Sequence, residues 1–257
     1  MLSNERNAPV AVFDSGAGGI AVLRAIRTRM PQEELLYFGD SANAPYGEKD
    51  AERIKELVLA HADQLLCRAK ALVLACNTAT AVAALEIRRR YPDAVVIGME
   101  PALRSALCVA EHPRVLVMAT DVTLREGKFA ALLQRHEKCC TVFTLSAPDI
   151  VRMVEQGEEN SPRMGAYIGE LLAPYRTLGL DAVVLGCTHF CFARAAISSA
   201  LGGDVPVFDG ISGTVSQLAR RLEAADLLTD RTTRGAVRMT SSNSRALPLF
   251  ARLLFGE

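Results

Sequence analysis

The chain has no excess of either charge and no long apolar run. Its 29 lysines and arginines balance 29 aspartates and glutamates, so no net field draws the protein to nucleic acid or to an anionic membrane surface. A helix that spans a bilayer needs about 18 or more apolar residues. Asn77, Thr78 and Thr80 interrupt the best candidate for such a helix. We therefore expect a protein that binds neither nucleic acid nor membrane.

No secretory signal is expected, and the chain has few lysines. The first ten residues, MLSNERNAPV, lack the apolar core of a signal peptide, and the seven cysteines are an odd number. Both features favour reduced thiols in the cytoplasm. Pyridoxal phosphate needs a lysine, but the chain has only five, and Lys70 lies at the wrong end of its strand. Cys187, His189 and Cys191 match no common zinc spacing, so we expect neither a cofactor nor a metal site.

The stretch from Ala71 to Thr80, ALVLACNTAT, organises the rest of the sequence. An apolar run of this length between polar segments is typical of a buried parallel strand, and Cys76 follows it where a helix begins. The same construction returns from Ala182 to Cys191, AVVLGCTHFC, which places Cys187 like Cys76. Ligands bind at the carboxyl ends of strands in open α/β sheets. The pattern predicts two thiols that face one ligand.

The chain repeats its order of elements. Strand–loop–helix units that begin near residues 10, 35 and 71 recur near residues 115, 141 and 182. Alternating strands and helices indicate parallel sheets with right-handed crossovers. We predict an α/β fold of two pseudo-symmetric three-layer domains with mostly parallel sheets and the active site in the cleft between them. The elements after residue 210 belong to neither repeat and are expected to pack on the first domain. The first domain would then comprise residues 1–100 plus 210–257, and the second residues 101–209.

The position of Cys76 before a helix favours its thiolate, because a helix N-terminus lowers the pKa of a thiol. Buried packing is the alternative, since most free cysteines behave as small apolar residues. The matched position of Cys187 favours chemistry at both thiols. We assign the remaining five cysteines to packing: Cys67, Cys108, Cys139, Cys140 and Cys191.

Three ionisable residues accompany the thiols. Asp14 ends the first strand, where it can bind a substrate ammonium, modulate a neighbouring thiol or cap a helix. His189 lies two residues beyond Cys187, and Glu155 is expected on a facing segment. Either side chain can exchange a proton with Cys187, since histidine titrates near neutrality and carboxylates serve as general bases.

A glycine-rich loop follows the first strand. Gly16 to Ala21 fits G-x-G-x-x-A, which imitates the dinucleotide-binding fingerprint. The fingerprint explains neither cysteine, and Asp14 would point a carboxylate at the pyrophosphate. We therefore favour a simpler use of the same loop, in which free backbone N–H groups at the helix start bind a substrate carboxylate.

Four motifs in this order carry a resemblance to a known family. They are Asp14-Ser15-Gly16-x-Gly18-Gly19, Gly39-Asp40 with Pro45-Tyr46-Gly47, Ala75-Cys76-Asn77-Thr78-Ala79, and Leu185-Gly186-Cys187-Thr188-His189. Together they resemble glutamate racemase, of the cofactor-independent aspartate/glutamate racemases, from about residue 9 to residue 222. The Pro-Tyr-Gly loop favours the glutamate branch over aspartate racemase.

The resemblance implies a function and a set of residues. Cys76 and Cys187 would transfer protons on opposite faces of the substrate Cα, with Asp14 supporting Cys76, and Glu155 and His189 supporting Cys187. The residues implied to bind the amino acid are Asp14, Ser15, Pro45, Tyr46, Gly47, Asn77, Thr78, Thr120, Thr188 and His189. The resemblance further implies a homodimer that supplies D-glutamate for peptidoglycan.

The chain departs from the family pattern mainly in its second half. Phe190-Cys191-Phe192 follows His189 where an aromatic residue and Pro-Leu are usual, Glu126 and Phe129 replace a serine and a tyrosine, and Gly210 replaces a serine. Two other functions remain open: a racemase or isomerase of aspartate or another dicarboxylate, and a regulatory protein that binds ligand without catalysis. The retention of both cysteines argues against the regulatory protein.

Overall fold

The computed structural model describes residues 5–125 and 139–256 and contains two parallel sheets. Sheet A has the strand order β4-β3-β1-β2-β9, and all its neighbouring pairs are parallel. Its strands are β1 (Val10–Asp14), β2 (Leu35–Gly39), β3 (Ala71–Leu74), β4 (Val95–Gly98) and β9 (Val237–Ser241). The apolar runs that predicted strands form its fully buried centre, β1 and β3.

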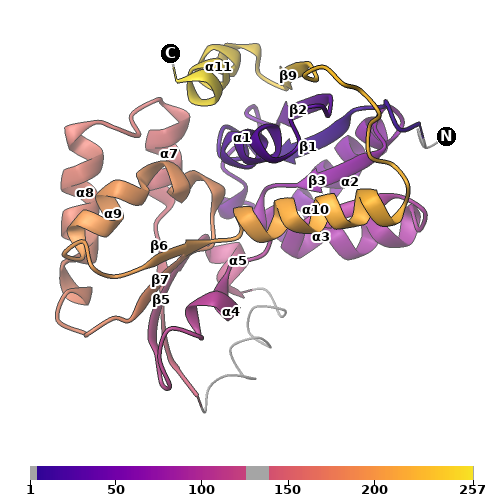
Figure 1. The fold of residues 1–257 in the computed structure, drawn as a ribbon. Coiled ribbons are helices and arrows are strands. Elements are labelled where there is room, and N and C mark those ends of the chain that lie inside the picture. Colours follow the sequence, from indigo (N-terminus) through magenta and orange to yellow (C-terminus); the bar gives the residue numbers. More distant parts are fainter. Residues whose placement is uncertain (1–4, 126–138, 257) are drawn as a thin grey trace.

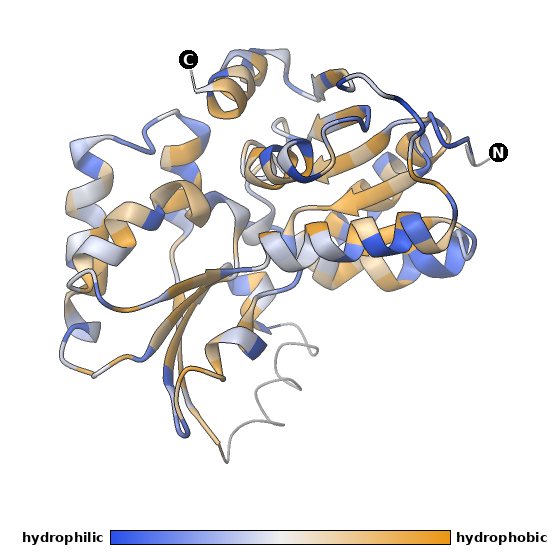
Figure 2. Cartoon of the chain, in the orientation of Figure 1, coloured by the Kyte–Doolittle hydropathy of each residue, from blue (hydrophilic) through white to orange (hydrophobic). Residues whose placement is uncertain are grey.

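Helices cover both faces of sheet A (Figure 1). One face packs against α1 (Ile20–Arg29), α10 (Ile211–Ala224) and α11 (Leu247–Phe255), and the other against α2 (Ala51–Leu66) and α3 (Asn77–Arg90). Asp50 begins α2 by accepting a hydrogen bond from the Glu52 N–H at 2.9 Å. In Figure 2 the strands consist mostly of hydrophobic residues, whereas hydrophobic and hydrophilic residues alternate along the helices, as the apolar periodicity predicts.

Sheet B has the strand order β6-β5-β7-β8 and is also parallel throughout. Its strands are β5 (Arg114–Ala119), β6 (Thr141–Ser146), β7 (Ala182–Leu185) and β8 (Val207–Asp209). The helices around it are α4 (Leu103–Ala106), α5 (Asp121–Arg125), α7 (Pro148–Glu155), α8 (Pro162–Leu172) and α9 (Arg194–Ala200). Four short 3₁₀ helices complete the described elements: η1 (Tyr46–Glu48), η2 (Ala173–Tyr175), η3 (Thr188–Ala193) and η4 (Ser244–Ala246).

The two sheets repeat one topology. Four strands of sheet A lie side by side in the order β4-β3-β1-β2, and those of sheet B lie in the order β8-β7-β5-β6. When the two orders are aligned, the first strand along the chain in one sheet matches the first in the other, the second matches the second, and so on. β1 therefore corresponds to β5, and β3, which precedes Cys76, corresponds to β7, which precedes Cys187. The predicted fold class, two pseudo-symmetric α/β units with parallel sheets, is confirmed.

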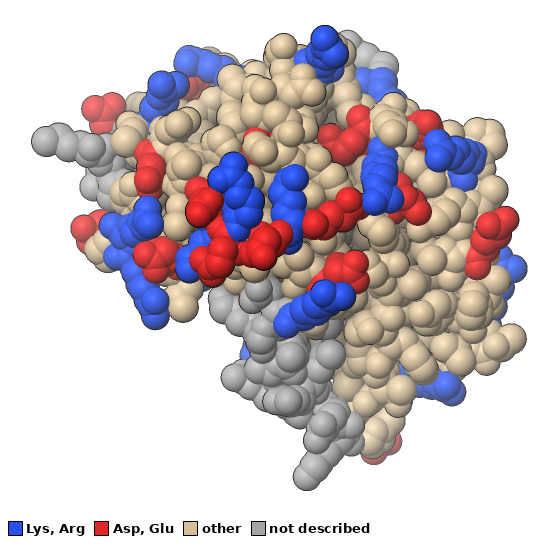
Figure 3. All heavy atoms as spheres, turned by 180° about the vertical axis from the view of Figure 1, so that it is seen from behind, with Lys and Arg blue, Asp and Glu red and all other residues tan. Residues whose placement is uncertain are grey.

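The C-terminal segment returns to sheet A, where β9 pairs with β2 and both α10 and α11 pack on α1. The division of the chain into domains at residues 100 and 210 stays a prediction. Among the described residues, none of the helices is both long enough and apolar enough to span a bilayer. Figure 3 shows one face of the molecule, where acidic and basic side chains alternate in a band and neither sign dominates. The departures at Glu126 and Phe129 lie outside the described residues.

Candidate active site

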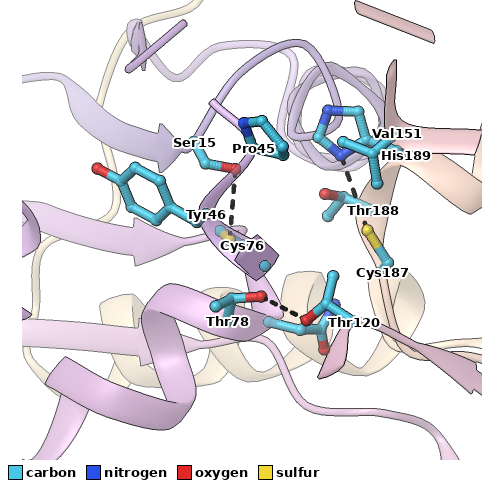
Figure 4. A pocket seen from close by; sticks show the side chains of 12 residues that line it. Ser15, Pro45, Tyr46, Cys76, Thr78, Thr120, Val151, Cys187, Thr188 and His189 are labelled. Atoms are coloured by element: carbon cyan, nitrogen blue, oxygen red, sulfur yellow. Dashed lines mark hydrogen bonds between the residues drawn. The ribbon is translucent and has the colours of Figure 1, made fainter. Parts of the chain in front are cut away.

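A pocket lies between the two sheets, at the carboxyl ends of their strands (Figure 4). It encloses about 290 Å³ of space, part of it open to solvent. Its walls are formed by Ser15, Pro45, Tyr46, Gly47, Cys76, Asn77, Thr78, Thr120, Val151, Cys187, Thr188 and His189. All the residues predicted for the site line this pocket except Asp14 and Glu155, which lie behind its wall. Val151 is a lining residue that the sequence motifs missed, because it is one apolar position of the amphipathic helix α7.

Cys76 is the N-cap of α3 and is buried in the wall that sheet A contributes. Its sulfur accepts a hydrogen bond from the Ala79 N–H at 3.4 Å and lies 3.6 Å from the Ser15 hydroxyl. Burial and the nearby Asp14 nevertheless raise the pKa of Cys76 to about 12. The helix N-terminus favours the thiolate, but the desolvation of this buried thiol opposes that effect and outweighs it here.

Cys187 lies on the opposite wall and contacts His189, which in turn contacts Glu155. The Cys187 sulfur is 3.7 Å from His189 Nδ1, and Glu155 Oε1 is 2.6 Å from His189 Nε2. Burial of His189 opposes its charge, but its contacts with Cys187 and Glu155 outweigh burial and raise its pKa well above the ordinary value. The three side chains therefore form a continuous path for a proton that ends at the Cys187 sulfur.

Asp14 connects the two halves of the site. Its carboxylate is fully buried and accepts a hydrogen bond from the Gly16 N–H at 2.9 Å. It also accepts one at 3.1 Å from the hydroxyl of Thr188, which belongs to the other lobe, the part of the chain around sheet B. Burial raises the pKa of Asp14, whereas His189 and these hydrogen bonds oppose the rise. Asp14 acts on Cys76 through its charge, and it bonds directly to the residue that follows Cys187.

The glycine-rich loop does not offer the free N–H groups that the sequence suggested. The Gly16 N–H donates to Asp14, the Ala17 N–H donates to Glu155 at 2.6 Å, and the Gly18 N–H points at His189 Nε2, 3.2 Å away. Asp14, together with Glu155 and His189 of the other lobe, thus occupies the positions that a carboxylate or a pyrophosphate would take. The glycine-rich motif therefore mediates contact between the lobes, and a bound ligand must accept hydrogen bonds from other groups.

The start of α3 provides such donors. Asn77 is buried, and among the described residues neither its side-chain nitrogen nor its oxygen has a hydrogen-bond partner. Beside it, the Thr78 hydroxyl lies 3.0 Å from the Thr120 hydroxyl of the other lobe. The first N–H groups of a helix also lack partners within the helix. Unpaired buried amides are unfavourable in a folded chain, so this end of the pocket is suited to a polar ligand.

Pro45, Tyr46 and Gly47 form another wall, and Asp40 holds it in place. The Tyr46 hydroxyl donates to Asp40 at 2.6 Å, and Asn43 Nδ2 donates to both Asp40 oxygens at 3.0 and 3.1 Å. Burial alone would raise the pKa of Asp40, but hydrogen bonds from His61, Ser242, Tyr46 and Asn43 lower it to about 2. Asp40 is therefore a charged anchor beneath the loop.

Asp40 should contribute stability that is lost in acid. A carboxyl whose folded pKa lies below its unfolded value stabilises the fold above the unfolded pKa, and this contribution disappears as the pH falls through the folded pKa. With the pKa lowered from 3.8 to about 2, the effect amounts to about 2 kcal/mol. We expect Asp40→Asn to lower the free energy of unfolding by about that amount at pH 7 and to lessen its decline between about pH 5 and pH 2.

Asp63→Asn is the matched control for this measurement, which is urea unfolding at a series of pH values. Asp63 also accepts a tyrosine hydroxyl, from Tyr91 at 2.8 Å, but its side chain is 45% exposed. Solvent screens exposed charges, so this substitution should change stability little. Equal losses in the two variants would contradict the role of Asp40 as a buried anchor.

The duplicated sheets, with one thiol after the same strand of each, define a two-lobed α/β protein whose two thiols line one pocket. A family model described as Asp/Glu/Hydantoin racemase matches residues 20–218. A glutamate racemase from Pseudomonas paraeruginosa is 46% identical over 223 residues, which cover 86% of this chain and 84% of that protein. The chain belongs to the Asp/Glu/Hydantoin racemase family and is therefore an isomerase, as the four motifs predicted.

Solved structures agree with this assignment. The glutamate racemase from Thermus thermophilus, in complex with β-chloro-D-alanine, has a TM-score of 0.82 and 32% identity, covering 97% of this chain and 94% of that one. The glutamate racemase from Francisella tularensis, in complex with D-glutamate, has a TM-score of 0.83 and 25% identity over the same shares of the two chains.

Among the described residues, no group of three or more His, Cys, Asp or Glu side chains could hold a metal ion.

Proposed function

We propose that this protein interconverts L-glutamate and D-glutamate by proton transfer at Cα between Cys76 and Cys187, without a cofactor. The observation that carries the proposal is the placement of the two thiols. They follow equivalent strands of two related sheets and lie on opposite walls of one pocket (Figure 4). Inversion of a stereocentre by proton transfer requires a base on one face of the carbon and an acid on the other. Two thiols with exchangeable roles meet this requirement in both directions.

The reaction needs one thiolate and one thiol in each direction. The thiolate takes the Cα proton, the electron pair stays on the substrate as a carbanion, and the opposite thiol protonates that carbon from the other side. Burial and Asp14 raise the pKa of Cys76, which suits it to begin as the proton donor. His189 can give a proton to Cys187 or take one from it, and Glu155 holds the far side of the imidazole ring. The next turnover in the opposite direction reverses both roles.

Polar groups of the pocket would bind the amino acid and stabilise the carbanion. The unpaired Asn77 amide, the Thr78 hydroxyl and the N-terminal N–H groups of α3 are suited to a substrate carboxylate. Donors that are already oriented toward developing charge act strongly in a site that excludes water. Thr188, which lines the pocket and whose hydroxyl donates to the buried Asp14 carboxylate, is suited to the ammonium end. The predicted binding set is completed by Ser15, Pro45, Tyr46, Gly47, Thr120 and His189, all of which line the pocket.

Glutamate is favoured as the substrate by the Pro45-Tyr46-Gly47 loop and by the relatives. The curated relative from Pseudomonas paraeruginosa is named a glutamate racemase, and the Francisella tularensis structure holds D-glutamate. The product D-glutamate would enter peptidoglycan synthesis. The enzyme would act in the cytoplasm as a homodimer, in keeping with the resemblance of its motifs.

Circular dichroism in deuterated buffer tests the proposal. The purified protein, without added cofactor, is given L-glutamate, D-glutamate, L-aspartate or D-aspartate. We expect the glutamate signals to decay to zero from both sides, with deuterium at Cα of the product, and little change for aspartate. Faster decay of the aspartate signals would identify an aspartate racemase, and no decay for any substrate would contradict catalysis.

A further inference from the structure

A second cavity adjoins the active-site pocket on its outer side. It comprises about 220 Å³ of space, part of it open to solvent, and shares four lining residues with the pocket: Pro45, Gly47, Thr120 and Val151. Its remaining lining residues are Glu48, Asp121, Ser146 and Pro148. Glu48 and Asp121 are exposed, whereas Cys76 and Cys187 in the inner pocket are only 6% and 7% exposed. The outer cavity therefore lies between solvent and the thiols.

The four shared residues form a neck between the two cavities, with Pro45 and Gly47 from one lobe and Thr120 and Val151 from the other. The contact is tight: a Cβ atom added to Gly47 would lie 2.6 Å from Thr120 Cβ. The hydrogen bond between the Thr120 and Thr78 hydroxyls, 3.0 Å long, holds the same contact from inside. A glutamate molecule cannot pass between these residues unless the two walls move apart.

An ion pair joins the two walls immediately outside the neck. Arg152, which follows Val151, pairs with Glu48, which follows Gly47, and also with Asp149 on its own helix. The side chains of Arg152 and Glu48 are 46% and 40% exposed, so water and solutes reach both. The bond to Glu48 crosses from one wall to the other, whereas the bond to Asp149 stays within α7.

We propose that the outer cavity is the antechamber through which the amino acid reaches the thiols, and that the Glu48–Arg152 pair is the clasp of its neck. A substrate carboxylate replaces Glu48 on Arg152, and this exchange releases the wall that carries Pro45 and Gly47. Guanidinium groups bind carboxylates in this way, with paired N–H donors. The substrate assignment rests on the proposed function, whereas the clasp itself rests on the contacts across the neck.

Alkylation of the thiols tests the clasp without substrate or turnover. The protein is treated with iodoacetamide, and the modification of each cysteine is followed by mass spectrometry. We expect Glu48→Gln to accelerate alkylation of Cys76 and Cys187 roughly two- to fivefold, the change that an exposed ion pair supports. The exposed residues Cys67 and Cys108 serve as internal references and should react at unchanged rates.

Asp149→Asn is the matched control, because it removes a carboxylate from the same arginine without crossing the neck. It should leave the alkylation rates of Cys76 and Cys187 unchanged. Unchanged rates in Glu48→Gln, or equal acceleration in both variants, would overturn the clasp. If the protein fails to racemise glutamate but Glu48→Gln still accelerates alkylation of Cys76 and Cys187 selectively, the proposed function is refuted and the clasp is supported.

The role of Arg152 as the carboxylate receptor has its own test. Arg152→Gln and Glu48→Gln both open the clasp, so both should expose the thiols to iodoacetamide. Only Arg152→Gln also removes the proposed carboxylate receptor. The KM of this variant for glutamate should therefore exceed the KM of Glu48→Gln by roughly two- to fivefold at low salt, with little difference in kcat. Equal KM values in the two variants would overturn this role.

Discussion

Replacement of Cys76 by Ala is expected to abolish racemisation of glutamate, and replacement of Cys187 by Ala should do the same. Each substitution removes the acid or base from one face of Cα, and no other thiol lines the pocket among the described residues. A positioned proton transfer contributes about 10²- to 10⁴-fold to a rate. We expect losses at or beyond the upper end of that range, since inversion requires both transfers. Decay of the circular dichroism signal of L- and D-glutamate measures the loss.

Exchange with solvent separates loss of one thiol from loss of the whole site. The thiol that remains can still remove the Cα proton of the enantiomer that presents it to that face. Cys76→Ala should therefore wash deuterium into one enantiomer of glutamate without inversion, and Cys187→Ala should do so with the other. Proton NMR of each enantiomer in deuterated buffer gives the two rates. Exchange of the same enantiomer in both variants would contradict the placement of the thiols on opposite faces.

Exposed cysteines are the matched controls for these substitutions. Cys67→Ala and Cys108→Ala remove the same group from positions that lie outside the pocket. Both variants should racemise glutamate at the unsubstituted rate. Full activity in Cys76→Ala or Cys187→Ala would refute the two-thiol mechanism, whatever the fold of the variant.

The strands and the paired thiols could be predicted from sequence because local patterns encode them. Apolar runs such as Ala71–Leu74 and Ala182–Leu185 specify buried parallel strands, and a cysteine follows each run after one further residue. The carboxyl ends of parallel strands lie at one edge of a sheet, so the sequence alone places each thiol at a site. The repeat then pairs the two thiols. None of these steps needs knowledge of how the lobes meet.

Contacts between the lobes could not be predicted, because residues far apart in the chain form them. The Ala17 N–H meets Glu155 across 138 positions, and the Asp14 carboxylate meets Thr188 across 174. The raised pKa of Cys76 could not be predicted for the same reason. The sequence reveals the helix that lowers its pKa, but burial and the Asp14 charge are properties of the assembled site.

Gly18→Ala is expected to remove most of the activity, because Gly18 lies directly against the proton path of the other lobe. An added Cβ atom would lie 2.5 Å from His189 Nδ1 and closer still to the Thr188 hydroxyl. His189 is 2% exposed, so the ring cannot move aside freely. Its displacement breaks the contact between Nδ1 and Cys187. A shift of about 1 Å in a reacting group can reduce a rate by about 10²-fold, and we expect a loss of kcat of that order.

Gly165→Ala separates this effect from the general consequence of adding a methyl group. Gly165 lies in α8, and an added Cβ there meets nothing within 4 Å. Alanine stabilises a helix relative to glycine by about 0.5–1 kcal/mol, so this variant should melt slightly higher and keep its activity.

In Gly18→Ala, kcat/KM must fall equally for both enantiomers, because their equilibrium constant is one, whereas the two kcat values can differ. A Gly18→Ala protein with unchanged kcat in both directions would show that His189 is not required to hold Cys187, and the proton path would then have to run through solvent.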